Sequence, residues 1–147
     1  MNGLRILGLG LVLVLAATGC GGDSEAPPEI QYDVLGTWTG TTATGVWVEM
    51  HISAEATGCC SRVASGQGRL APAAGDTLAF NTLGFNQTGH VFFNLFGGEP
   101  ETLLGQFSGG FESSASLAGV MLGPEAFGQP AVGPFTVDSL PLVLHRQ

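Results

Sequence analysis

Turn-forming residues divide the chain after residue 35 into short segments rich in Val, Phe, Leu and Thr. These segments lack the sustained three-to-four spacing of apolar residues that an amphipathic helix shows. The pattern therefore predicts strands, and the short links between them are typical of antiparallel neighbours. Eight strands are expected, over residues 36–42, 46–55, 62–71, 77–86, 90–96, 102–112, 116–122 and 135–146.

Apolar and polar side chains alternate most clearly in three of these strands. The apolar sets are Val46, Val48, Met50, Ile52 and Ala54 in the second strand, Leu103, Gly105, Phe107, Gly109 and Phe111 in the sixth, and Leu140, Leu142 and Leu144 in the last. Because successive side chains of a strand point to opposite faces, one face is expected to be dry and the other wet.

The strand count and the short links predict an all-β fold. We expect an eight-stranded antiparallel up-and-down barrel, because closure removes the exposed strand edges of an open sheet. Glycines inside the strands, at positions 66, 68, 105, 109, 110 and 119, permit the sharp coiling of a small barrel. A two-sheet β-sandwich is the alternative fold.

The first nineteen residues have the pattern of an export signal. Arg5 precedes an apolar run from Ile6 to Ala17, which is shorter than the roughly 20 residues that span a bilayer as a helix. The sequence Ala17-Thr18-Gly19-Cys20 that follows resembles the lipobox of bacterial lipoproteins. The resemblance implies cleavage of residues 1–19 and a lipid on Cys20. An ordinary secretory signal with a chance cysteine is the alternative.

Residues 20–34 are expected to form a flexible tether, since this segment is rich in Gly, Pro and acidic residues. Each buried methylene contributes ~0.8 kcal/mol, so two or more acyl chains on Cys20 would hold the protein on a bilayer. Gly21 stands where lipoproteins retained in the inner membrane have aspartate. We therefore expect a lipid-anchored envelope protein, in the outer membrane and facing the periplasm or the surface if the source is Gram-negative. Residues 35–147 are expected to form the single β-barrel domain.

Charge excludes several functions. The chain has 12 acidic and 4 basic residues, a formal net charge of −8, and loss of Arg5 with the signal would make it −9. Nucleic acid is therefore not expected as a partner. All four basic residues are arginine, which excludes a Schiff-base lysine, a P-loop lysine and a polybasic membrane patch containing lysine.

Gly36-Thr37-Trp38 opens the first expected strand, and Arg146 closes the last. This arrangement is similar to the signature of the calycins, the barrels that include lipocalins and avidin-like proteins. The resemblance implies that Trp38 plugs one end of the barrel and that Arg146 lies over it, a contact of about 1–2 kcal/mol when desolvated. Trp38 and Trp47 are the only tryptophans, so the tryptophan-lined biotin pocket of avidins is not reproduced.

Two binding functions are compatible with such a barrel. The first is a small apolar ligand held inside, because an eight-stranded barrel can hold one small ligand or be filled by side chains. The candidate residues are three glycines that leave space and the apolar residues beside them: Gly105, Gly109, Gly119, Phe107, Phe111 and Met121. The alternative is that flanking Phe and Leu side chains fill this space.

The second function is protein interaction, as an envelope inhibitor or an assembly module. The strand over residues 90–96 is apolar on both faces, and its outward residues are expected to be Phe92 and Phe96. These rings are candidates for a contact patch. The alternative is that the loop over residues 123–134 covers them.

The sequence argues against catalysis. It contains no Gly-x-Ser-x-Gly elbow, His-Glu-x-x-His motif or phosphate-binding glycine loop, so we expect no enzyme activity and no cofactor. The three histidines, His51, His90 and His145, fall on separate strands, and we therefore expect no metal site.

Cys59 and Cys60 are adjacent in an expected turn. Adjacent Cα atoms lie 3.80 Å apart, whereas bridged pairs usually lie at roughly 4.4–6.8 Å, so a disulfide between them needs a distorted backbone. We favour such a disulfide in an oxidising compartment. Free thiols, a bridge to another chain and a thiolate metal clip are the alternatives.

Overall fold

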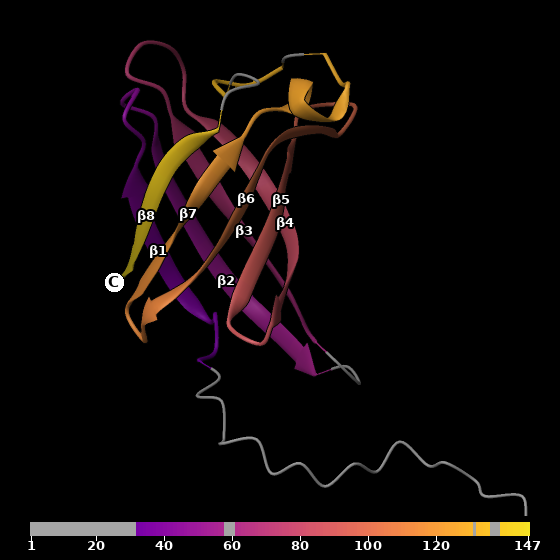
Figure 1. Cartoon of the computed structure of the whole chain (residues 1–147). Helices are drawn as coiled ribbons and strands as arrows, with labels where there is room; N and C mark the ends of the chain where they lie inside the picture. The colour runs from indigo at the N-terminus through magenta and orange to yellow at the C-terminus, as the bar shows by residue number, and fades with distance from the viewer. Residues whose placement is uncertain (1–31, 58–60, 131, 136–138) are drawn as a thin grey trace, which may run out of the picture.

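Eight antiparallel strands follow one another around a closed barrel in the order of the sequence (Figure 1). The computed structural model describes residues 32–57, 61–130, 132–135 and 139–147. The strands are β1 (Gly36–Thr41), β2 (Trp47–Thr57), β3 (Arg62–Ala71), β4 (Leu78–Gln87), β5 (His90–Gly97), β6 (Thr102–Ser113), β7 (Ser116–Leu122) and β8 (Leu140–Arg146). Because β8 also pairs with β1, the expected barrel is confirmed and the β-sandwich alternative is wrong.

Seven of the eight strands lie within two residues of their expected bounds. The last strand is the exception, because it begins at Leu140 rather than at residue 135. Phe135 does not pair with a neighbouring strand, and its side chain is instead buried in the core. A short 3-10 helix, η1 (Pro124–Phe127), lies in the connection between β7 and β8.

Two register shifts change the side-chain alternation that the sequence predicts. The shift between Ile52 and Ala54 leaves Ala54 exposed, so its expected place on the dry face is wrong, and Glu55 takes an inward position opposite buried Ala64. The second shift is in β6, where Leu104 has no partner on β5 because Gly105 pairs with Leu95 and Leu103 pairs with Phe96. Leu104 enters the core there in place of Leu103. An extra residue in one strand moves every following side chain to the other face.

Apolar side chains fill the interior of the barrel. The largest fully buried side chains are Trp38, Phe93, Phe107, Phe135, Met50, Ile52, Leu70, Leu95, Leu117, Met121, Leu142 and Leu144. They come from seven of the eight strands and from the loop that holds Phe135, and they form one core cluster. Eight strands enclose a space just wide enough for such side chains, so this core accounts for the interior.

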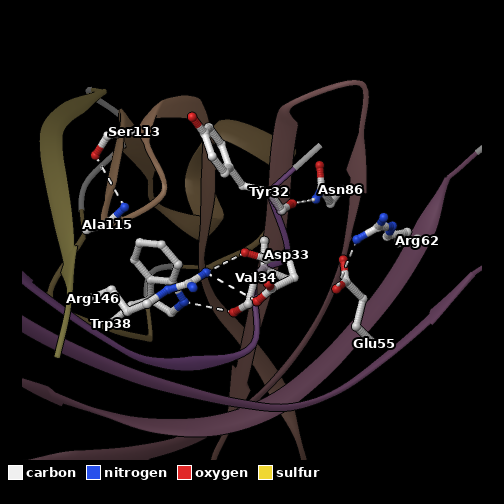
Figure 2. Close-up of polar contacts among 10 residues, drawn as sticks. All are labelled: Tyr32, Asp33, Val34, Trp38, Glu55, Arg62, Asn86, Ser113, Ala115 and Arg146. Carbon is white, nitrogen blue, oxygen red and sulfur yellow. Dashed lines mark hydrogen bonds and ion pairs between the residues drawn. The ribbon is translucent and has the colours of Figure 1, made fainter. Parts of the chain in front are cut away.

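The chain enters the barrel at one end, which we call the tether end. Residues 32–35 form a strap across this end (Figure 2). Trp38 Nε1 donates a hydrogen bond to the Val34 carbonyl at 2.8 Å, and Val34 is fully buried. Arg146 Nη2 donates to the carbonyl and the carboxylate of Asp33. The Arg146 guanidinium carbon also lies 4.7 Å from the centroid of the Trp38 ring.

The opposite end, which we call the loop end, is covered by the connection between β7 and β8. Phe135 is 1% exposed, and its ring would lie 2.7 Å from a Cβ placed on Gly105. Gly133 approaches Leu104 from the same connection. Both ends of the barrel are therefore occupied by the chain itself. In the part of the chain that the structure describes, no helix has the length and apolar character needed to cross a bilayer.

The closure of the tether end predicts that the two tryptophans differ in their contribution to stability. Trp38→Phe should lower the free energy of unfolding by about 2–4 kcal/mol, because it removes buried ring volume and leaves the Val34 carbonyl without its donor. Trp47→Phe is the matched control and should change it by less than about 1 kcal/mol, because Trp47 is only half-buried on the outer wall. Urea unfolding followed by far-UV circular dichroism measures both. Equal losses would contradict the role of Trp38 in this closure.

Candidate functional site

The six residues predicted to line a ligand cavity lie together on the inner face of β6 and β7. Phe107 is paired with Met121, and Gly109 is paired with Gly119. The side chains of Phe107 and Met121 are fully buried in the core. Phe111 lies closer to the tether end, with its ring 6.1 Å from the Trp38 ring and 5.3 Å from the Tyr32 ring.

Packed atoms occupy the space beside the three glycines of this set. A Cβ on Gly105 would meet the Phe135 ring. A Cβ on Gly109 would overlap the Ala118 carbonyl oxygen, and one on Gly119 would overlap the carbonyl oxygen of Ser108. These glycines therefore let β6 and β7 approach closely, and they do not open a space between the strands.

The outer wall carries a groove across β2, β3, β4 and β5, in the half of the barrel nearer the loop end. Its volume is about 450 Å³. Arg69 and Glu49 form an ion pair along one side, with 2.6 Å between Nη2 and Oε1, and Asn81 Nδ2 donates to Glu101 Oε1 at 3.2 Å. The ring of Phe96 adds an apolar surface. We call this feature the wall groove. It offers charge, amide groups and an aromatic face to the same ligand.

Two other depressions lie on the surface. One, of about 470 Å³, crosses β1 and β8 and is lined by Thr39, Gly40, Thr41, Trp47, Pro141, Leu142, Val143, His145 and Gln147. The other, of about 210 Å³, lies at the loop end beside Val132. Neither lining contains an ion pair described in the structure. None of the six predicted cavity residues lines any of these three depressions.

A second surface feature is an apolar patch on β3, β4 and β5 near the tether end, made of Val63, Leu83, Phe85 and Phe92. The rings of Phe85 and Phe92 stack with their centroids 5.2 Å apart. Phe92 and Phe96 face outward as the sequence predicts, since Val91, Phe93 and Leu95 between them are buried. The structure places the two rings in different features, with Phe92 in the apolar patch and Phe96 in the wall groove.

A small polar cluster lies at the tether end, where Arg62 of β3 is paired with Asn86 of β4. Asn86 Nδ2 donates to the Tyr32 carbonyl at 2.7 Å, and Arg62 Nη1 lies 3.6 Å from Glu55 Oε2 (Figure 2). The Glu55 side chain is 5% exposed. The register shift in β2 is what turns this carboxylate inward, where an arginine partner offsets part of the cost of burial.

The three histidines make separate contacts. His51 Nδ1 lies 3.1 Å from Thr37 Oγ1, and His90 Nε2 lies 3.2 Å from Ser108 Oγ. His145 is paired with Thr39 on β1. Among the described residues, no three His, Cys, Asp or Glu side chains gather as they would around a metal ion.

Some predicted residues lie outside the described part of the chain. They are Cys20 with the signal peptide and most of the tether, and the pair Cys59 and Cys60. The lipidation of Cys20 and the disulfide between Cys59 and Cys60 both stay predictions.

No protein-family model, curated protein or solved structure matches this chain. The contact of Arg146 with the Trp38 ring has the arrangement that the calycin resemblance implies. Membership of that family stays a prediction.

The wall groove is not predicted by the sequence pattern. Its polar residues were visible as the outward positions of three strands, among them Glu49, Arg69 and Asn81. What brings them together is the pairing of Glu49 with Arg69 and of Gln67 with Asn81. Alternation within one strand does not fix the register between strands, so the sequence pattern left these residues unconnected.

The close approach of β6 and β7 predicts that a methyl group on Gly109 is costly. Gly109→Ala should lower the free energy of unfolding by about 1–3 kcal/mol, because the added carbon overlaps backbone atoms of β7. Gly110→Ala is the control, since the nearest atom to its Cβ lies at 3.3 Å, and it should cost less. Thermal and urea unfolding measure the difference. A stabilising Gly109→Ala would instead indicate empty space beside this strand.

Proposed function

We propose that this protein is a lipid-anchored, non-catalytic binding protein of the bacterial cell envelope, and that it binds a protein partner in the wall groove. The observation that carries this proposal is the filled interior, which the strap and Phe135 close at both ends. A partner bound on the outer wall requires no change in the core. A small apolar ligand inside the barrel would have to displace side chains that are already packed.

The position of the strap supports the anchor. Eleven residues, 21–31, separate Cys20 from Tyr32. Fully extended, the twelve steps between these two residues reach about 40 Å, which is enough to hold the tether end near a bilayer without burying the barrel in it. The acyl chains implied by the lipobox resemblance would then fix the location while the barrel carries the binding surface.

The chemistry of the wall groove suits an extended segment of a protein. Arg69 donates two hydrogen bonds to Glu49, and a polar side chain of the partner can take the place of either residue in this interaction. The Phe96 ring offers a contact for one apolar side chain. An envelope inhibitor and an assembly module would both use such a groove, and the identity of the partner distinguishes them.

A photo-crosslinking residue at Gln67 tests this proposal in the full-length protein expressed in its own cells. We expect one discrete adduct, because Gln67 lines the wall groove. The double variant Glu49→Ala with Arg69→Ala should lose the adduct, since both halves of the ion pair are removed. Circular dichroism should show that this variant still folds, because Arg69 is exposed and Glu49 is partly exposed.

A probe at Val143 is the matched control, because this residue is exposed in the depression over β1 and β8. We expect no adduct there. An adduct at Val143 alone, or an adduct at Gln67 that persists unchanged in the double variant, would contradict the wall groove as the binding surface.

A further inference from the structure

The apolar patch is continuous across three strands. Val63 is paired with Phe85, and Phe85 is paired with Phe92. Val63, Leu83 and Phe85 are 46%, 51% and 44% exposed, and the stacked Phe92 ring is half-buried. The outer face of a sheet that meets water is normally polar, and contiguous exposed apolar side chains mark a contact surface.

The patch lies where the chain leaves the barrel toward Cys20. Asn86, which follows Phe85 in β4, donates its side-chain hydrogen bond to the carbonyl of Tyr32, the first described residue. The turn between β4 and β5 lies at the same end (Figure 1). The tether is therefore fixed to the barrel one residue away from the patch.

Charge is distributed unevenly between the two ends of the described part of the chain. Near the tether end the charged side chains are Asp33, Glu55, Glu112, Arg62 and Arg146, a formal charge of −1. In the half nearer the loop end they are Glu49, Asp76, Glu99, Glu101, Glu125 and Arg69, a formal charge of −4. The barrel itself is therefore repelled less by an anionic bilayer at its tether end than at its loop end, while Asp23, Glu25 and Glu29 add three negative charges to the tether.

We infer that the apolar patch docks on the surface of the bilayer that holds the acyl chains of Cys20. This inference rests on the lipid anchor of the proposed function. The flexible tether expected from the sequence would have, over twelve steps, a root-mean-square length of roughly 17–21 Å, which would keep the patch at a high effective concentration near the lipid. A contact that is too small to hold a free protein on a membrane is then sufficient to keep the patch docked. Docking of the patch turns the loop end and its acidic side chains away from the bilayer.

Tryptophan quenching by brominated lipids tests this docking in the full acylated chain. Leu83→Trp places a reporter in the patch, and Phe127→Trp places one of similar exposure, 42% against 51%, in η1 at the loop end. Each variant is bound to vesicles of phosphatidylethanolamine and phosphatidylglycerol, with and without bromine on the acyl chains. The signal of Trp38 and Trp47 in the parent protein is subtracted.

We expect bromine to remove at least half of the emission added by Leu83→Trp and little of that added by Phe127→Trp. Adding Phe85→Ser and Phe92→Ser to the Leu83→Trp variant should restore the emission. Both serines replace outward residues, so the core stays intact. Equal quenching of both reporters, or unchanged quenching in the serine variant, would overturn the inference.

The mass of the vesicle-bound protein separates failure of the docking from failure of the anchor. An acylated, vesicle-bound chain whose Leu83→Trp reporter is not quenched would refute docking and leave the anchor in place. In that case a cross-linked dimer, or an adduct with another protein, would show that a different partner covers the patch. A chain without acyl groups on Cys20 would refute both the anchor and the docking that rests on it.

Discussion

The pairing of β1 with β8 is the contact that turns a meander of strands into a closed barrel. It is short, joining Trp38 to Arg146 and Thr39 to His145. The first of these pairs also holds the strap, because Trp38 donates to Val34 and Arg146 donates to Asp33. Strand closure and closure of the tether end therefore depend on the same two side chains. Loss of this contact would expose the core and release the strap together.

A closed barrel of eight strands has room for its own side chains or for one small ligand. The interior core, the strap and Phe135 use that room. The surfaces left for binding are on the outside, and they differ along the barrel. The apolar patch lies near the tether end, and the wall groove lies nearer the loop end. Along β4, Phe85 lies four steps from Asn81, or about 13 Å, so the two surfaces are far enough apart to be covered at the same time.

Much of the fold could be predicted from the sequence, because turn residues and side-chain alternation are local signals. They placed seven strands within two residues and the inward set of β8 at Leu140, Leu142 and Leu144. They failed where a residue is inserted into the ladder, at Ser53 and Leu104, because no local pattern marks the extra residue. Phe135 was assigned to a strand because it is apolar, but its role is set by the space beside Gly105 on a distant strand.

The candidate surfaces were less predictable than the fold for the same reason. The outward orientation of Phe92 followed from alternation, but its contact with Phe85 depends on the register between β4 and β5. The glycines of β6 and β7 suggested a cavity because they lack side chains. In the structure Gly109 is paired with Gly119, and the two backbones approach each other there. Ligand binding by these residues stays a prediction.

Native mass spectrometry of the full-length protein, purified from its own cells, tests the filled interior most directly. We expect the mass of the polypeptide with its covalent modifications and no non-covalently bound small molecule. A stoichiometric apolar molecule that remains bound until the barrel unfolds would contradict this expectation, because such a ligand would have to share the interior with the buried core side chains.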